Sequence, residues 1–413
     1  MTGSLGAMCK RNKPIKVANS KKTILYQYDN GKFINSFKEV FMPLKSNPMG
    51  KIYCTLILLL MLFGCQTAFD SKDLDRNPSL LTNVDKIFEG CNNSNSPGCA
   101  LAIIKDGKIL YKRGYGMADL EHDIPISTNT VFYVGSVSKQ FTAMCLLLLE
   151  EEGKLSLDDN IRKYLHKFPE YNKPITIRQL IHHTSGIKDY LLLWLISGKD
   201  YLDYMSEYEV YKLISSQKEL DFTPGERHAY SNSGYFLSSL IIRKVSGKSL
   251  REYTEENIFK PLGMKNSIFN DSNKNIIKNR AFGYTTLNEG NFGNVFMRFD
   301  LVGSGGLYTT IEDLYLWDQN FYHNKLGKGG QTLINKMCTN GKFNDGKEVN
   351  YAFGLINGQY KGFRTIQHGG WLGGYRAHLL RFPEQALTII ILSNLSTFDP
   401  GSLANKVADI FLD

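Results

Sequence analysis

Strand-like segments lie at both ends of the main body of this chain, and their distribution limits the possible folds more than any other feature of the sequence. At 101–104 and 109–111, apolar runs flank an Asp-Gly turn, a pattern typical of a β-hairpin. Short helical patterns broken by turns follow at about 155–300. This order predicts an α/β protein of the α+β type, in which an antiparallel sheet built from both ends is flanked by helices and carries an inserted, mostly helical lobe. The strand-like runs near the C-terminus are 351–355, 363–368, 375–382 and 387–392.

The most regular helical pattern lies at 137–152, where apolar residues recur at helical spacing ahead of a glycine. Because apolar residues occupy most of its faces, we expect this helix to be buried. Thr310 and Asp313 have the spacing of a capping box and predict a helix at 311–321, and a last helix is expected at about 402–412. The cleft between the sheet and the lobe is the natural place for a functional site. Within the lobe, helices are expected at 175–183, 208–220, 235–245 and 250–259.

The formal charge of +9 is concentrated in the first 65 residues of the 413-residue chain. That leader holds ten of the 49 Lys and Arg residues but only two of the 40 Asp and Glu residues, which leaves 39 basic and 38 acidic residues in the body. A near-neutral body offers no electrostatic footprint for a polyanion, so we expect no nucleic-acid partner. The chain's hydrophobic content of 42% is enough for a substantial globular core.

Within the leader, an apolar run at 52–64 ends directly before Cys65. Thirteen residues are too few to cross a bilayer, which needs about 20, so the run predicts a cleaved secretory signal. Its Leu-Phe-Gly-Cys ending resembles a bacterial lipoprotein signal, which implies that Cys65 is lipidated and that the protein is anchored to a membrane in the cell envelope or periplasm. Cleavage elsewhere or a short buried helix are the alternatives.

Signals of this kind begin within a few residues of their charged region, whereas here a long polar stretch comes first. We therefore expect the true start at Met49 or Met42, and the leader, 1–65, is left out of the fold prediction. A polar tether is expected at 66–80, followed by the folded domain at 81–413.

The chain has seven cysteines, and export to an oxidising compartment would allow a disulfide between two of them, Cys91 and Cys99. The chain has no C-x-x-C and no H-E-x-x-H spacing, so neither a zinc ribbon nor a zincin site is expected. No second metal-ligand spacing accompanies His182, His183 and His228, which are interpreted as loop or packing residues.

Ser136 and Lys139 lie three residues apart at the start of the predicted helix. One helical turn brings both side chains to one face, so that the amine can hydrogen-bond to the hydroxyl that must lose its proton. Alternatively, Ser136 is an N-cap and Lys139 a solvated lysine, but the helix macrodipole disfavours a lysine in the first turn by about 0.3–1 kcal/mol. The same S-x-x-K spacing occurs at two other places, Ser185/Lys188 and Ser215/Lys218, neither of which opens a long buried helix.

Tyr230 and Asn232 follow a turn and precede another predicted helix. If both side chains point into the cleft beside Ser136, the phenol can relay a proton and the amide can orient a substrate. Alternatively, Asn232 or Ser233 merely caps the next helix. The same Y-x-N spacing recurs by accident at Tyr28/Asn30 and Tyr322/Asn324.

His368, Gly369, Gly370 and Trp371 lie at the end of a predicted strand. Glycines remove side chains from a strand where another backbone must approach closely. A backbone N–H from this edge, paired with that of Ser136, can form an oxyanion hole, in which each donor is typically worth about 2.7–4 kcal/mol. The alternative is a bulge with a structural histidine.

Taken together and in this order, the S-x-x-K, Y-x-N and H-x-G motifs resemble those of the penicillin-recognising serine hydrolases of the class C β-lactamase type. That family includes D-alanyl-D-alanine carboxypeptidases, D-aminopeptidases and esterases, and the resemblance covers residues 81–413. It implies a β-lactamase/transpeptidase-like fold, with Ser136 as the acylated nucleophile, Lys139 and Tyr230 as the general-base pair, and no metal or organic cofactor. It also implies that the amides of Ser136 and Trp371 form the oxyanion hole. The expected substrate contacts are Asn232, His368, Gly369 and Gly370.

One departure from the class C pattern concerns the third motif, where β-lactamases carry Lys-Thr-Gly and this chain carries His368. A histidine is mostly neutral near pH 7 and suits a substrate carboxylate less well than a permanent cation. We expect an envelope serine hydrolase that forms an acyl-enzyme with D-amino-acid peptides, amides, esters or β-lactams. The alternative is a catalytically inactive protein on the same scaffold that binds cell-wall peptide or penicillin.

Overall fold

The computed structural model describes residues 79–298 and 300–412, together with four short strands near the N-terminus. The chain divides into two units, Met1–Ala68 and Phe69–Asp413. Cys65, the secretory signal, the two candidate start sites and nearly all of the expected tether lie outside the described residues, so these stay predictions. In the first unit the strands pair as two antiparallel hairpins, β1 (Lys16–Asn19) with β2 (Lys22–Leu25) and β3 (Gln27–Asp29) with β4 (Lys32–Ile34).

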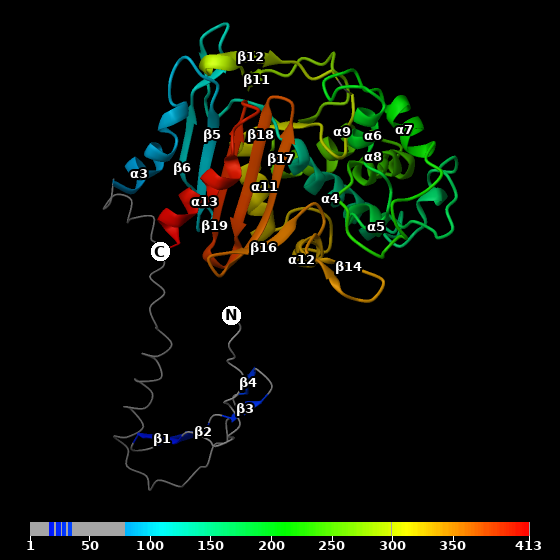
Figure 1. The fold of residues 1–413 in the computed structure, drawn as a ribbon, viewed down its shortest axis with the longest axis horizontal. Helices are drawn as coiled ribbons and strands as arrows, with labels where there is room; N and C mark the ends of the chain where they lie inside the picture. The colour runs from blue at the N-terminus through cyan, green and yellow to red at the C-terminus, as the bar shows by residue number, and fades with distance from the viewer. Residues whose placement is uncertain are drawn as a thin grey trace, which may run out of the picture. The chain divides into compact units, whose positions relative to one another are not determined.

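An antiparallel sheet of six strands forms the centre of the second unit (Figure 1). In spatial order the strands are β16 (Ile356–Tyr360), β17 (Phe363–Leu372), β18 (Tyr375–Phe382), β19 (Leu387–Ser393), β5 (Cys99–Lys105) and β6 (Lys108–Tyr115). The C-terminal β19 pairs with the N-terminal β5, from Leu387 opposite Lys105 to Ser393 opposite Cys99. Both ends of the body therefore build one sheet, which confirms the prediction from the strand-like runs.

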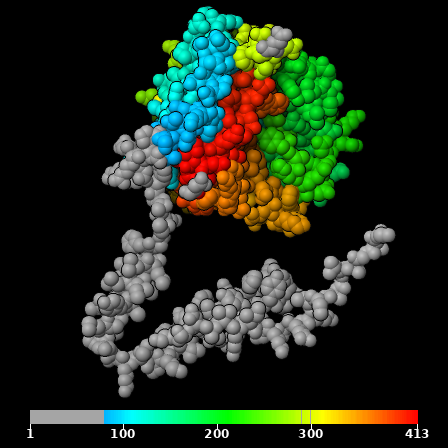
Figure 2. All heavy atoms as spheres, turned by 60° about the vertical axis from the view of Figure 1, so that its left-hand side comes forward, coloured from blue at the N-terminus to red at the C-terminus, as the bar shows by residue number. Residues whose placement is uncertain are grey.

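Helices cover both faces of this sheet, which is why all seven residues of β19 are buried. On one face, α3 (Ser79–Ile87) packs against α13 (Pro400–Phe411), and Figure 2 shows the red C-terminal segment beside the blue start of the unit. On the other face lies α11 (Ile311–Tyr322). The long α4 (Ser138–Glu151) joins this side to the helical lobe and is almost completely buried, as its apolar pattern predicts.

The helical lobe is formed by short helices between α4 and the C-terminal strands (Figure 1). The helix predicted at 175–183 is shorter than expected, because Thr176 caps its start and His183 adopts a left-handed φ of 56°. The helices are α5 (Ile177–Ile181), α6 (Tyr190–Ile196), α7 (Glu207–Ser215), α8 (Asn232–Ser246), α9 (Leu250–Thr254), the π-helical η4 (Glu255–Phe259) and α10 (Lys260–Leu262).

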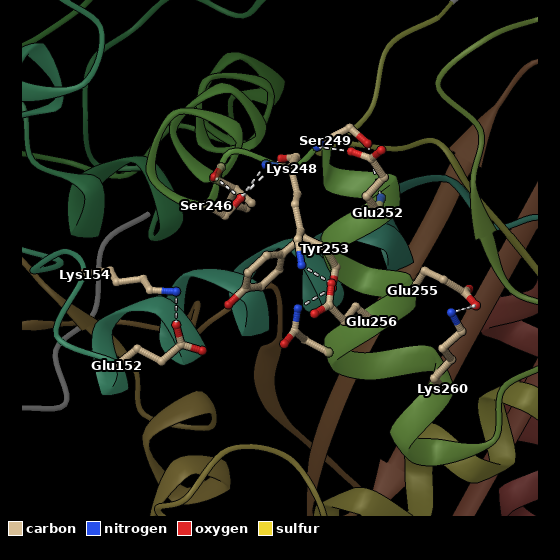
Figure 3. Close-up of polar contacts among 12 residues, drawn as sticks. Glu152, Lys154, Ser246, Lys248, Ser249, Glu252, Tyr253, Glu255, Glu256 and Lys260 are labelled. Carbon is tan, nitrogen blue, oxygen red and sulfur yellow. Dashed lines mark hydrogen bonds and ion pairs between the residues drawn. The ribbon is translucent and has the colours of Figure 1, made fainter.

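Capping boxes begin three of these helices, α5, α7 and α9. Figure 3 shows the third one, in which the Ser249 hydroxyl accepts from the backbone N–H of Glu252 (3.2 Å) and the Glu252 carboxylate accepts from the N–H of Ser249 (2.8 Å). Two ion pairs also involve this helix. Lys248, just before its start, pairs with Glu256, and Lys260 pairs with Glu255. The helix predicted at 250–259 is present without a break, because η4 follows α9 directly, but its second half is π-helical.

The strand predicted at 351–355 is wrong, since only Tyr351 makes an isolated bridge and β16 begins afterwards. Gly354 explains the difference. It has a φ of 70°, and a Cβ at this position would lie only 2.6 Å from the backbone N of Gln140. The segment therefore packs onto the start of α4 instead of extending the sheet.

Two smaller predictions are also corrected. The Thr310 hydroxyl accepts from the N–H of Asp313 (3.1 Å) and begins α11, but the Asp313 carboxylate turns away to the N–H of Asn266 (2.7 Å), so the capping box is only half formed. Cys91 and Cys99 are free thiols, so the disulfide between them is not formed. Cys99 is buried in β5, and the neighbouring Cys91 thiol donates to the carbonyl of Phe88 (3.2 Å).

The remaining elements are short. Among the helices of the described residues, none has the length and apolar character needed to span a membrane. The connecting helices and strands are η1 (Glu89–Cys91), β7 (Met117–Asp119), β8 (Ile124–Pro125), β9 (Phe132–Tyr133), η2 (Gly135–Val137), η3 (Ile161–Lys163), β10 (Ile268–Phe269), β11 (Gly283–Thr286), η5 (Asn288–Gly290), β12 (Phe292–Val295), β13 (Leu307–Thr309), α12 (Gln331–Met337), β14 (Gly341–Lys342), β15 (Glu348–Val349) and η6 (Pro383–Gln385).

Candidate active site

Ser136 and Lys139 meet where β9 leads through η2 into α4. β9 is the end strand of a three-stranded sheet with β13 and β10, which anchors the turn that carries Ser136. The Nζ atom of Lys139 lies 3.0 Å from Oγ of Ser136, as one helical turn between them requires. Lys139 is fully buried, so the alternative of a solvated lysine does not hold.

The Lys139 amine is surrounded by neutral acceptors. Besides the Ser136 hydroxyl, Nζ contacts Oδ1 of Asn232 (2.9 Å) and the backbone carbonyl of Ser304 (2.7 Å). Burial lowers the pKa of Lys139 to about 7, against a smaller opposing effect of the Asp189 carboxylate. The charged amine donates to all three oxygens, whereas a neutral amine needs its two N–H groups only for the two carbonyl oxygens and has a lone pair that can accept the proton of the Ser136 hydroxyl.

Tyr230 lies on the other side of the serine. Its ring centroid is 4.9 Å from Nζ of Lys139, and its phenol is near enough to Ser136 for the serine hydroxyl to lower the phenol's pKa. Desolvation raises the pKa of the Tyr230 phenol, so this group stays protonated at neutral pH. A neutral phenol in contact with the serine can pass a proton between the hydroxyl and a leaving group.

Asn232 is the first residue of α8, but its side chain does not cap that helix. Oδ1 faces Lys139, while Nδ2 and the backbone N–H both donate to Oδ2 of Asp189. The hydroxyl of Ser233 is also engaged elsewhere, because it donates to the carbonyl of Lys188 (2.6 Å). The structure therefore turns the amide of Asn232 towards Lys139 and Asp189 rather than into a helix cap.

Strand β17 passes directly against η2, as the glycines of the third motif predict. A Cβ on Gly370 would lie 1.9 Å from the carbonyl oxygen of Val134 and 3.2 Å from the N atom of Ser136. Likewise, a Cβ on Gly135 would lie 2.5 Å from the N atom of Trp371. The amides of Ser136 and Trp371 thus border one junction of two backbones, the arrangement that an oxyanion hole requires.

His368 is buried in β17, with 3% of its surface exposed. Its Nδ1 lies 2.6 Å from the carbonyl of Gly369, which can only accept, so Nε2 accepts from the hydroxyl of Tyr351 (3.0 Å). Burial, together with the nearby Lys139, lowers the pKa of His368 to about 3. His368 is therefore a neutral, positioned ring and supplies no cation for a substrate carboxylate.

Sequence reasoning missed three residues that shape the site: Asp189, Ser304 and Tyr351. The only signal for Asp189 was its place before a short apolar helix, where it does cap α6 by accepting from the N–H of Leu191 (3.0 Å). Its second role, towards Asn232, has no local signature.

His183 packs against Tyr230, with 4.2 Å between the ring centroids, and its Nδ1 accepts from the N–H of Ser231 (3.1 Å). This agrees with its interpretation as a packing residue. The ring of His182 is buried nearby, with Nδ1 3.0 Å from the carbonyl of Tyr351.

One other cluster of metal-ligating side chains exists among the described residues, Asp119, Glu121 and His122. It begins at the last residue of β7 and contributes no side chain to the site around Ser136. Asp119 is already bound to the ring of His122 (2.8 Å) and to the N–H of Glu121 (2.8 Å), which explains the cluster as a turn.

Comparison with known proteins agrees with this geometry. The chain matches the family described as Beta-lactamase over residues 84–411. It is 28% identical over 300 residues to a D-aminopeptidase of Gluconobacter oxydans, covering 72% of this chain and 56% of that protein. It is 29% identical over 333 residues to a penicillin-binding protein of Bacillus subtilis, covering 76% of this chain and 71% of that protein.

The fold is shared with solved structures. An octameric penicillin-binding protein homologue from Pyrococcus abyssi has a TM-score of 0.70 and 30% identity, over 81% of this chain and 77% of that chain. The chain spans little more than half the length of the D-aminopeptidase, 56%. The match over residues 84–411 and the shared fold lead to one conclusion: the chain belongs to the beta-lactamase family.

Proposed function

We propose that this protein is a serine hydrolase that acts through an acyl-enzyme on Ser136. The observation that carries the proposal is the fully buried Lys139, with Nζ 3.0 Å from Oγ of Ser136 and a pKa of about 7. A surface lysine would be charged at neutral pH and unable to accept a proton. With a pKa of about 7, Lys139 is partly neutral at this pH and can accept one.

In the proposed reaction, Oγ of Ser136 attacks the substrate carbonyl while Lys139 accepts the hydroxyl proton. The new C–O bond places negative charge on the carbonyl oxygen, which accepts hydrogen bonds from the amides of Ser136 and Trp371. The bond to the leaving group then breaks, and that group takes the proton by way of Tyr230. In the second half, Lys139 and Tyr230 accept a proton from a water molecule, whose oxygen bonds to the acyl carbon. The bond from that carbon to Oγ breaks, the proton passes to Oγ of Ser136, and the acid leaves.

We propose D-amino-acid amides, peptides and esters as the substrate class, with β-lactams as a further acyl donor. The D-aminopeptidase among the relatives supports the first group. A neutral His368 in place of a lysine favours substrates that need no cation at this position.

The leading test is covalent labelling with a fluorophosphonate or a penicillin. The wild-type protein is expected to be labelled, and Ser136→Ala to lose the label. Ser215→Ala, which changes the serine of a second S-x-x-K pair, is the matched control and should be labelled normally. A folded wild-type protein that neither probe labels contradicts the proposal, and binding without turnover on ester, amide and β-lactam panels favours the inactive alternative.

We also propose that the protein is exported and lipid-anchored in the cell envelope, on the strength of the apolar run that ends at Cys65. Cell fractionation tests this. The labelled protein should sediment with membranes, and Cys65→Ala should move it to the soluble fraction; an unchanged distribution contradicts the anchor.

A further inference from the structure

The two carboxylate oxygens of Asp189 accept hydrogen bonds from two different helices. Oδ1 accepts from the N–H groups of Leu191 (3.0 Å) and Leu192 (3.2 Å) and so caps α6. Oδ2 accepts from both nitrogens of Asn232, the backbone N–H and the side-chain Nδ2 (2.9 Å). One side chain therefore ties the start of α6 to the start of α8.

This double contact decides which way the Asn232 amide faces. An amide has one donor end and one acceptor end, and a carboxylate can bind only the donor end. With Nδ2 held by Asp189, Oδ1 is left to accept from Nζ of Lys139 at 2.9 Å. If the amide were reversed, its NH₂ group would face the amine, and two donors would oppose each other in a buried site.

Asp189 also acts on Lys139 through its charge, since its carboxylate raises the pKa that burial lowers. The other titratable groups around the amine are neutral. Tyr235 and Tyr230 face Nζ with their rings, at 5.5 and 4.9 Å, and desolvation raises the pKa of both phenols. The pKa values of the buried His183 and His368 are lowered by burial and by Lys139.

We propose that Asp189 is a positioning residue of the reaction, which orients the amide of Asn232 and thereby sets the direction of the lone pair of Lys139 towards Ser136. The inference rests on the proposed function, because it assigns Asp189 a role in activating the same serine. The hydrogen bonds of its carboxylate go to Leu191, Leu192 and Asn232, so Asp189 reaches the serine only through other residues.

The test compares Asp189→Ser with the wild type by the rate of fluorophosphonate labelling of Ser136 from pH 5 to 9. Serine is a good N-cap, so α6 keeps its cap, but its hydroxyl is too short to reach Asn232. The rate on the high-pH plateau should fall by about 10- to 100-fold, because a misplaced reacting group costs this much. The acidic limb should move to lower pH, because removal of the carboxylate lets Lys139 lose its proton more easily.

Two further variants make the test specific. Asp189→Asn keeps the size of the side chain but offers one acceptor where two are used, so it should show the same lowered plateau and the same shift of the limb. Asp221→Ser removes an exposed carboxylate of the same lobe and should change neither.

In an Asn232→Ala background, Asp189→Ser should lower the plateau little further, because the residue through which it acts is already gone. Thermal unfolding shows that each variant is folded. A folded Asp189 variant with an unchanged plateau, or with an unmoved acidic limb, overturns the inference. So does a full, multiplicative loss in the Asn232→Ala background. If the wild type itself is not labelled, the proposed function fails instead, and the two failures are distinct.

Discussion

At the scale of single residues, the site depends on a lysine that the protein buries completely. A buried ammonium without a counter-ion in direct contact is costly, and the usual response is a lowered pKa. Here Lys139 contacts three neutral oxygens, and its pKa falls to about 7. The cost of burial therefore produces the property that a general base needs, an amine that is partly neutral at physiological pH.

Lys139 should make the activation of Ser136 depend on pH. Because the neutral amine is the active form, the rate of fluorophosphonate labelling should rise as pH increases through about 7 and then level off. Lys139→Arg keeps a permanent charge and should lower the plateau by about 10²- to 10⁴-fold. Lys188→Arg, in another S-x-x-K pair, should have no effect. A wild-type rate that does not change between pH 5 and 9 contradicts this role.

At the scale of elements, the decisive contact is between β17 and the 3-10 turn η2. Two backbones can approach this closely only where side chains are missing, and Gly370 and Gly135 meet this need from opposite sides. The contact joins a strand of the sheet to the start of α4 and brings the amides of Trp371 and Ser136 together. Gly369, the other glycine of the motif, has no such close neighbour.

The two adjacent glycines should therefore respond differently to the same substitution. In Gly370→Ala the new Cβ would lie 1.9 Å from the carbonyl oxygen of Val134, so the strand must shift away from η2. The loss of one oxyanion donor should lower kcat by about 10²- to 10³-fold. In Gly369→Ala the nearest atom is Nδ1 of His378 at 3.5 Å, an ordinary contact, so the strand keeps its place against η2 and the loss in kcat should be much smaller than in Gly370→Ala.

Both variants are measured on the same ester substrate. Equal losses in Gly369→Ala and Gly370→Ala contradict the assignment of the close approach to Gly370. A normal kcat in Gly370→Ala contradicts the need for the Trp371 amide.

At the scale of the whole molecule, the candidate active site lies where the sheet and the helical lobe share one continuous core. Several histidines are buried in this core, and desolvation lowers the pKa of His182 to about 4 and that of His368 to about 3. A neutral histidine in the folded state and a charged one in the unfolded state make stability depend on pH. Above pH 6.5 these histidines are neutral in both states and do not lower the free energy of unfolding. As pH falls below 6.5 only the unfolded state gains the proton, so the free energy of unfolding falls until pH reaches the folded-state pKa.

The free energy of unfolding should therefore fall when pH is lowered from 6.5 to 4. His182→Gln keeps a donor for the carbonyl of Tyr351 but cannot titrate, so its free energy of unfolding should lose about 2–3 kcal/mol less than that of the wild type over this range. Urea unfolding at several pH values measures the difference. His166→Gln, on the surface, should follow the wild type, and a His182→Gln curve parallel to the wild type contradicts the prediction.

Local patterns in the sequence determine β18 and β19 almost to the residue, because most residues of both strands are apolar and buried. They also determine the pairing of Ser136 with Lys139, since three residues of helix place both side chains together regardless of the remaining fold. The order of the three motifs is enough to predict the family, which the match over residues 84–411 confirms.

Other features depend on contacts between segments far apart in the chain, and the tertiary structure alone decides them. Asp189 has the local signature of a helix cap, but its second oxygen binds Asn232, 43 residues away. The apolar run at 351–355 packs onto α4 as a loop although its composition suits a strand equally well. The physical reason is that periodicity in a sequence records which side of a segment is buried, whereas the partner that buries it is chosen only when the chain has folded.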